Sequence, residues 1–206
     1  MGREQRMNSN ELTFTAPSWD FIEELTVKLY YSIIQDNFIP DIIAGISRGG
    51  LVPARIVSDL FLSQGIKVTL SIMQIGFYAG IAKTEKEPII YQDLPGRIHG
   101  RRILLLDDVA DTGVSLEFAL QYLKMKKPTE VRAATLYWKP WSSFKPQYYV
   151  EETSDWIIFP HEKFEFMTEQ MKRNNFSVQE AKSFFIKIVG LNVNSVENFF
   201  KYIYKD

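Results

Sequence analysis

The sequence predicts an α/β fold in which helices flank a mostly parallel central sheet and a helical appendage follows at the C-terminus. Two observations support this prediction. Up to Glu162, short apolar runs typical of buried strands alternate with segments whose apolar residues recur at helical spacing. Beyond Glu162 the pattern is helical. We therefore expect a core over residues 1–162, with a loose tail over roughly the first ten residues, and an appendage over residues 163–206.

The first half of the core begins with an amphipathic helix. Its apolar positions, from Phe21 to Ile34, recur at the spacing of one helix face. Two short apolar runs then suit buried strands, and Pro53 is typical of the first turn of a helix between them. The expected elements are a helix over 18–35, a strand over 41–46, a helix over 51–62 and a strand over 68–73.

The middle of the chain is rich in glycine, proline and charged residues. Residues 74–99 are expected to form a long loop with a hairpin strand around 89–91, and long loops in compact domains tend to be functional. The strongest strand pattern covers 103–106 and ends at Asp107-Asp108. The remaining expected elements are a helix over 115–126, a strand over 131–137 and two shorter apolar pieces over 148–150 and 156–159, which complete the alternation.

The predicted appendage contains two helix-start patterns. Ser177-Val178-Gln179-Glu180 has the spacing of a capping box, and the amphipathic run behind it stops at Gly190. Asn194-Ser195-Val196-Glu197 repeats the pattern before a second apolar run. The appendage could pack beside a substrate site or form subunit contacts, and its sequence does not choose between these roles.

Composition and charge exclude several kinds of chemistry. The chain has no cysteine and two histidines, so disulfide scaffolds, thiolate nucleophiles and multi-histidine metal centres are excluded. Its 24 basic and 25 acidic side chains give a formal net charge of −1, so a field strong enough for general nucleic-acid binding is not expected. The polar start and the lack of an apolar run of about 20 residues predict a cytoplasmic protein with no membrane partner.

A strand, an acidic glycine-containing loop and a helix follow one another over residues 103–126. In open α/β sheets, ligands bind beyond the carboxyl ends of the strands. Here the loop and the helix start offer backbone N–H groups, two hydroxyls and a glycine that permits a tight turn around an anion. Asp107 and Asp108 are acceptors suited to vicinal hydroxyls or to a divalent cation. A phosphate site beside a diol site describes a ribose 5-phosphate.

The string from Leu104 to Gly113 resembles the phosphoribosyl-pyrophosphate (PRPP) signature of the type I phosphoribosyltransferases. The resemblance implies the type I phosphoribosyltransferase fold, PRPP as substrate and Mg²⁺ as cofactor. The residues implied to bind the ribose and its phosphate are Asp107, Asp108, Ala110, Asp111, Thr112, Gly113, Val114 and Ser115. Ser47, Arg48 and Gly49 resemble the family's pyrophosphate-binding loop, in which an unusual peptide conformation turns an N–H toward the leaving group.

Three further patterns resemble the bacterial and archaeal 6-oxopurine branch of the family, whose substrates are hypoxanthine, guanine and xanthine. These patterns are Trp19-Asp20, the run over 47–53 and Trp138-Lys139-Pro140. The branch implies that Lys139 donates to the purine O6 and that an aromatic ring stacks on the base. The implied purine-binding residues are Lys139, Trp156, Ile157 and Glu162, and Tyr78 is implied in a mobile loop over 74–88. Glu162 stands where the family usually has Asp, so the preference at purine C2 is left open.

The resemblance, which covers about residues 18 to 162, implies transfer of the phosphoribosyl group to purine N9 with release of pyrophosphate. Asp111 is the expected catalytic residue, as general base or as electrostatic partner of the N7 proton. Asp107, Asp108 and Glu162 are the expected metal contacts, mainly through substrate and water. Family members are commonly dimers or tetramers, so a homodimer or homotetramer is expected.

Two alternatives stay open. A regulator that keeps the PRPP signature and binds nucleic acid is disfavoured because the basic residues are scattered, and the best cluster, Lys124 with Lys126 and Lys127, is small. The same transfer to adenine, orotate or uracil is the second. Lys139 argues against adenine, because the 6-amino group of adenine is itself a donor. A purely structural module does not account for the intact motif.

Overall fold

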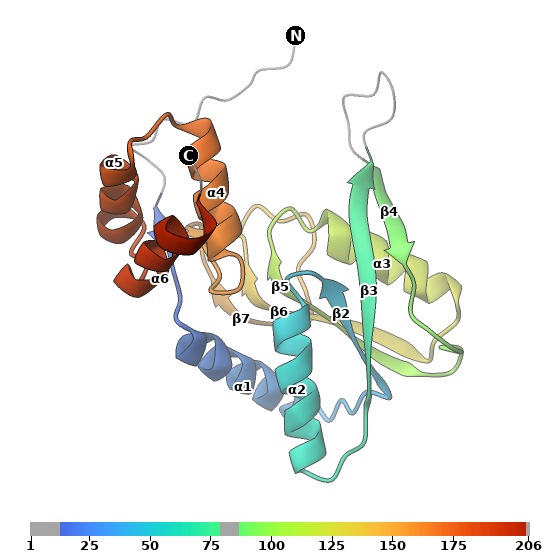
Figure 1. Cartoon of the computed structure of the whole chain (residues 1–206). Helices are drawn as coiled ribbons and strands as arrows, with labels where there is room; N and C mark the ends of the chain where they lie inside the picture. Colours follow the sequence, from blue (N-terminus) through green and yellow to red (C-terminus); the bar gives the residue numbers. More distant parts are fainter. Residues whose placement is uncertain (1–12, 79–86, 205–206) are drawn as a thin grey trace. The chain divides into compact units, whose positions relative to one another are not determined.

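A computed structural model describes residues 13–78 and 87–204 (Figure 1). Internal contacts divide these residues into two compact units. Residues 20–153 form the first, which we call the core unit, and residues 13–19 together with 154–204 form the second, which we call the terminal unit. None of the helices in the described ranges has the length and apolar character needed to cross a membrane.

The core unit is built on a six-stranded sheet with the order β4-β3-β2-β5-β6-β7. All pairings in this sheet are parallel except the one between β3 and β4. The strands are β2 (Ile42–Ser47), β3 (Thr69–Tyr78), β4 (Glu87–Gln92), β5 (Arg102–Ala110), β6 (Glu130–Trp138) and β7 (Tyr148–Glu152). The helices are α1 (Trp19–Gln35), α2 (Leu51–Ser63) and α3 (Val114–Met125). The predicted fold class is confirmed.

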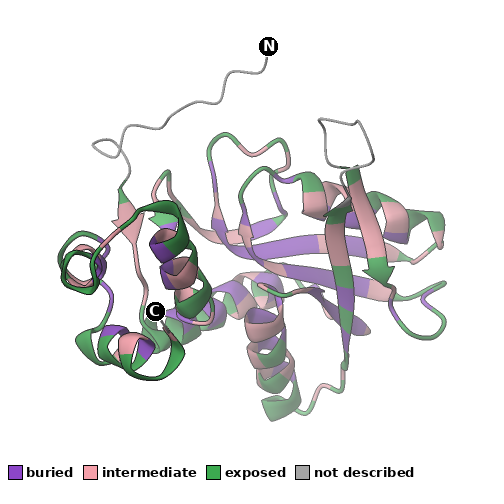
Figure 2. Cartoon of the chain, turned by 45° about the horizontal axis from the view of Figure 1, so that its top comes forward, coloured by how far each residue is buried: buried purple, intermediate pink, exposed green. Residues whose placement is uncertain are grey.

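Both faces of the central strands are covered, which explains their unbroken apolar runs. Side chains alternate across a strand, so Ile42 and Ala44 of β2 lie on one face together with Leu105 of β5, in a cluster with the apolar side of α3. Helices α1 and α2 lie on the other side of the sheet (Figure 1). Figure 2 shows the result as mostly buried central strands.

Several strands of the core unit are longer than predicted, and β5 and β3 differ most. β5 continues through Asp107 and Asp108 to Ala110, because the pairing with β6 extends as far as Trp138. β3 continues to Tyr78 as half of a hairpin with β4, so much of the predicted loop over 74–99 is strand. The hairpin strand expected near 89–91 is β4. Residues 79–86 of the predicted mobile loop lie outside the described residues.

The terminal unit has a small sheet of its own, and this corrects one prediction. β8 (Trp156–Ile157) does not complete the alternation of the central sheet. It pairs in parallel with β1 (Phe14–Thr15), which the sequence did not indicate. The pairing is reinforced because Asp155 accepts a hydrogen bond of 2.6 Å from the Thr15 hydroxyl. A two-residue strand has too little pattern to predict which partner it will find.

Three helices and their π-helical extensions form the rest of the terminal unit. They are α4 (Lys163–Arg173), α5 (Val178–Ser183) extended over Phe184–Ile188, and α6 (Val193–Asn198) extended over Phe199–Ile203. The capping box at Ser177 and Glu180 is confirmed, and Gly190, with φ +81°, follows the end of the first run. The second predicted cap is wrong. Asn192, not Asn194, caps α6, since its extended backbone lets its side chain accept from the N–H of Asn194 at 2.9 Å.

The boundary of the terminal unit differs from the predicted division at 162/163. Ile158 shares a buried cluster with Met167 and Phe185 of the helices, and Phe14 packs against the same cluster. Because these contacts tie residues 13–19 and 154–162 to the helices, the compact unit is larger than the predicted appendage.

Candidate active site

The loop between β5 and α3 is the segment that the sequence predicts to bind phosphate. Gly113, with φ +84°, occupies the N-cap position of α3, in a conformation that favours glycine. A Cβ at this position would lie 2.6 Å from Ser142 Oγ and 2.7 Å from Phe144 N, so space also demands glycine. A cavity of about 90 Å³ lies at this loop. Six of the predicted residues line it, namely Asp107, Ala110, Asp111, Thr112, Gly113 and Ser115. The exposed side chain of Val114 is not among its lining residues.

The two neighbouring carboxylates lie at the carboxyl end of β5. Asp107 accepts hydrogen bonds from the N–H of Asp108, at 3.0 Å, and from the N–H of Gly50. Burial raises the pKa of the Asp107 carboxyl well above its usual range, and the nearby charge of Asp108 raises it further. Asp108 is itself 6% exposed. Two carboxyl groups side by side, one of them buried and one with a strongly raised pKa, are typical of a functional site.

The predicted pyrophosphate loop lies directly over this pair. It joins β2 to α2, and its Ser47–Arg48 peptide bond is cis, an unusual peptide conformation of the kind that the resemblance implies. A Cβ on Gly49 would lie 2.4 Å from the Asp108 carboxyl carbon, and one on Gly50 would lie 2.2 Å from the carbonyl oxygen of Leu106. The absence of side chains at both glycines therefore allows the loop to approach the end of β5. Arg48 is exposed at the surface of this loop.

Lys139, at the end of β6, is brought to the phosphate loop. Its side chain is 5% exposed, and its N–H donates to the carbonyl of Ala110 at 3.1 Å. Its ammonium lies over the ring of Trp141, 5.4 Å from the centroid. The indole N–H of Trp141 donates to Asp111 Oδ1 at 3.1 Å. Trp141 was missed in the sequence, where its position two residues after Lys139 was the available signal.

The other predicted purine-binding residues belong to the terminal unit. Trp156 is 53% exposed and Ile157 is buried, as expected for neighbours on opposite sides of β8. The Glu162 carboxylate accepts from the N–H of Phe159 at 3.3 Å in the turn before α4. Lys139 lies in the core unit, so a joint site of all four residues stays a prediction.

Tyr78, the predicted mobile-loop tyrosine, is the last residue of β3. Its backbone pairs with that of Glu87 in the antiparallel hairpin. The segment between these two residues is the part of the predicted loop that lies outside the described residues.

The donor set at the end of β5 fits Mg²⁺ in part. Carboxylate oxygens are hard ligands of the kind that Mg²⁺ prefers, and Asp107 and Asp108 supply them. Within residues 13–78 and 87–204 no group of three or more His, Asp or Glu side chains is arranged to hold a metal ion. Two carboxylates suit a cation that brings further ligands with it from substrate phosphates and water.

Comparison with known proteins agrees with this geometry. The family model for the phosphoribosyl transferase domain matches residues 18–164. The chain belongs to the phosphoribosyltransferase family. The resemblance inferred from the motifs is thus confirmed, and the chain is an enzyme of this family. The match ends at the beginning of α4, so most of the terminal unit's helices lie beyond it.

Relatives of this phosphoribosyltransferase include enzymes named for purine substrates. A xanthine-guanine phosphoribosyltransferase of Gluconobacter oxydans is 29% identical over 149 residues, which cover 71% of this chain and 83% of the relative. A hypoxanthine phosphoribosyltransferase of Haemophilus influenzae is 26% identical over 132 residues, covering 64% and 68%. The crystal structure of a purine phosphoribosyltransferase from Pyrococcus horikoshii matches with a TM-score of 0.65 and 30% identity, over 73% of this chain and 94% of that one.

Proposed function

We propose that this phosphoribosyltransferase transfers the 5-phosphoribosyl group of PRPP to N9 of a 6-oxopurine, in purine salvage. The observation that carries the proposal is the grouping of the phosphate cradle, the Asp107–Asp108 pair and Lys139 at one edge of the core sheet. The purine substrates in the names of the Gluconobacter and Haemophilus relatives support the same acceptor class.

The phosphate loop and the carboxylates bind PRPP in this proposal. Backbone N–H groups over 111–115 hold the 5-phosphate at the start of α3. Asp107 and Asp108 accept from the ribose hydroxyls and would hold the Mg²⁺ shell through them. When bound, Mg²⁺ supplies positive charge beside the departing pyrophosphate. The loop of Ser47, Arg48 and Gly49 contacts the pyrophosphate, and the Arg48 guanidinium adds a fixed positive charge.

The transfer exchanges one bond for another at ribose C1. The C1–O bond to pyrophosphate breaks with its electron pair, and positive charge develops on the ribose ring. The lone pair of purine N9 forms the new C1–N9 bond, and Asp111 takes the proton from N7. Lys139 donates to O6, and its ammonium favours a carbonyl over an amino group because it has no acceptor. Trp156 stacks on the base, with Ile157 and Glu162 at its edge.

An activity panel tests this function. Purified protein is incubated with PRPP, Mg²⁺ and one of hypoxanthine, guanine, xanthine, adenine or orotate, and pyrophosphate release is measured. We expect release with at least one 6-oxopurine and none with adenine or orotate. Release with adenine alone would contradict the acceptor class, and binding of PRPP without release from any base would favour the regulatory alternative.

Two variants test the assigned roles. Asp111→Asn should lower kcat by about a hundredfold or more, the usual contribution of a positioned acid or base. Lys139→Ala should raise the KM for the purine and leave the KM for PRPP nearly unchanged. Turnover near the wild-type value in the first variant, or a large loss of PRPP affinity in the second, would contradict the respective role.

A further inference from the structure

The turn over residues 139–144 is fixed against the phosphate loop by backbone contacts. The N–H and the hydroxyl of Ser143 both donate to the carbonyl of Thr112, at 3.0 and 2.9 Å. The N–H of Lys139 donates to the carbonyl of Ala110 at 3.1 Å. The Cα of Gly113 packs against the same turn so closely that a Cβ has no room. The backbone of Trp141 is thus placed relative to Asp111 by contacts in which neither side chain takes part.

The Trp141 side chain then touches both polar groups that face the base in the proposed function. Its indole N–H donates to Asp111 Oδ1 at 3.1 Å, and the Lys139 ammonium lies 5.4 Å from its ring centroid. The indole is 56% exposed, so it adds little to the buried core. A large ring that contributes little to the core but makes two polar contacts is better explained by the site than by packing.

We propose that Trp141 is a positioning residue for the phosphoribosyl transfer, which orients the Asp111 carboxylate with its N–H and holds the Lys139 ammonium with its ring face. This inference rests on the proposed function and assigns to it a residue that the sequence motifs do not include.

The chemistry of indole suits both tasks. Its N–H is a donor only, so it binds a carboxylate and cannot itself accept the N7 proton of the purine. A bond to Oδ1 leaves Oδ2 to take the N7 proton. The ring face attracts an ammonium through its quadrupole without itself occupying the N–H donors that would reach the purine O6.

Graded variants separate the two contacts. Trp141→Phe keeps a ring and removes the N–H, and it should lower kcat about tenfold, with the KM for PRPP changed by less than about twofold. Trp141→Leu removes the ring as well and should also raise the KM for the purine about fivefold. Tyr31→Phe is the control, because it removes a polar group from an exposed ring (63%) on α1 that is not among the cavity's lining residues, and it should leave both constants unchanged.

A double-variant cycle distinguishes positioning from a general structural effect. In the Asp111→Ala background, Trp141→Phe should change the residual kcat by less than about twofold, because the group on which it acts is gone. An equal tenfold loss in both backgrounds would overturn the inference, as would wild-type kcat in Trp141→Phe alone.

A spectroscopic measurement makes the contact testable without turnover. The indole N–H signal of Trp141, assigned by its loss in Trp141→Phe, should shift in Asp111→Ala in a two-dimensional nitrogen–proton NMR spectrum. An unmoved signal would overturn the inference whatever the activity. A wild-type protein that released no pyrophosphate with any purine would instead overturn the proposed function, so the two failures are distinguishable.

Discussion

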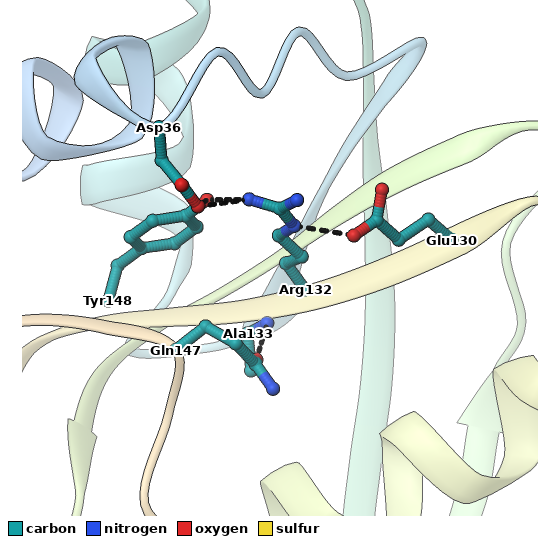
Figure 3. Close-up of polar contacts among 6 residues, drawn as sticks. All are labelled: Asp36, Glu130, Arg132, Ala133, Gln147 and Tyr148. Atoms are coloured by element: carbon teal, nitrogen blue, oxygen red, sulfur yellow. Dashed lines mark hydrogen bonds and ion pairs between the residues drawn. The ribbon is translucent and has the colours of Figure 1, made fainter.

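Two groups of charged residues in the core unit are organised in opposite ways. Toward the amino end of β6, Arg132 donates to Glu130 at 2.6 Å and contacts both Asp36 and Tyr148 (Figure 3). Its guanidinium also lies over the Phe38 ring, 4.4 Å from the centroid. Burial lowers the pKa of Arg132, but its hydrogen bonds to Glu130 and Tyr148 outweigh burial and raise the pKa. Opposite charges are therefore paired here by protein groups alone.

At the carboxyl end of β5 the neighbouring charges have the same sign. Asp107 and Asp108 are adjacent, and burial and the mutual charge raise the pKa of Asp107. Such a pair costs stability in the ligand-free protein, whereas a paired cluster stabilises the fold. The comparison indicates that one edge of the sheet is built for stability and the other for a ligand that brings hydroxyl donors or positive charge.

The largest expected effect comes from Gly49, where the pyrophosphate loop passes over Asp108. In Gly49→Ala the new methyl group would lie 2.4 Å from the Asp108 carboxyl carbon and both its oxygens, so the loop or the carboxylate must move. We expect kcat/KM for PRPP to fall by about a hundredfold or more. Steady-state kinetics measures this loss, and the melting temperature shows whether the fold is kept. PRPP kinetics like those of the wild type would contradict the close approach of loop and strand.

The second largest effect is expected on stability, at the cluster of Arg132 with Glu130, Asp36 and Tyr148. Arg132→Met removes a largely buried cation that contacts Glu130, Asp36 and Tyr148, and it also removes the contact with the buried Phe38 ring, so the free energy of unfolding should fall by about 2 kcal/mol. Urea denaturation measures this change. Arg55→Met is the matched control, because the Arg55–Asp59 pair is exposed on α2, and its cost should be below about 0.5 kcal/mol. Equal costs in the two variants would show that the Arg132 cluster has no special role.

Asp107→Asn should instead raise the free energy of unfolding. Asparagine keeps an acceptor oxygen for the N–H groups of Asp108 and Gly50 but removes one of two like charges, so the ligand-free protein should gain about 1 kcal/mol. PRPP affinity should fall in the same variant.

The pH dependence of this effect follows from linkage. Because the folded pKa of Asp107 is raised, its contribution to stability is fully present below the unfolded pKa of about 4 and is lost as pH rises through the folded pKa. Asp107→Asn should therefore be closest to wild type at acid pH and gain most at neutral pH. Denaturation curves across this range measure the difference, and a gain that did not grow with pH would contradict the raised pKa.

The smallest effect is expected at Asp36, whose side chain is 61% exposed. Asp36→Asn weakens the contacts with Arg132 and Tyr148, and water screens the lost charge, so stability should fall by about 0.5 kcal/mol. Asp36→Asn and Asp107→Asn make the same chemical change, and their opposite signs in one denaturation series would sharpen the comparison. A gain of stability in Asp36→Asn would contradict the conclusion that the Arg132 cluster stabilises the fold.

Most of the core unit could be predicted from the sequence because its signals are local and strong. The apolar runs of β2 and β5 are buried on both faces, so no polar residue interrupts them. β1 and β8 could not be predicted as partners, since each is two residues long and lies about 140 residues from the other. Asn192 could not be predicted as the cap of α6, because Asn194 has the same side chain two residues later.

The candidate site was predictable where one continuous segment carries it. Most of the residues from Asp107 to Ser115 line one cavity, because they follow one another along a single turn from β5 into α3. Trp141 was not predictable, because the sequence gives no sign of which polar groups its ring and N–H will meet. The close approach of Gly49 to Asp108 could not be predicted either, since the two residues are 59 positions apart.

By itself, the sequence determined the order of strands and helices in the core unit and the family to which the chain belongs, because periodicity and a contiguous motif are properties of neighbouring residues. Only the tertiary structure decided that Gly49 lies against Asp108, that Trp141 contacts both Asp111 and Lys139, and that β1 pairs with β8. Each of these contacts joins residues from separate elements. Their existence depends on how the sheet brings strand ends together, and no local pattern encodes that.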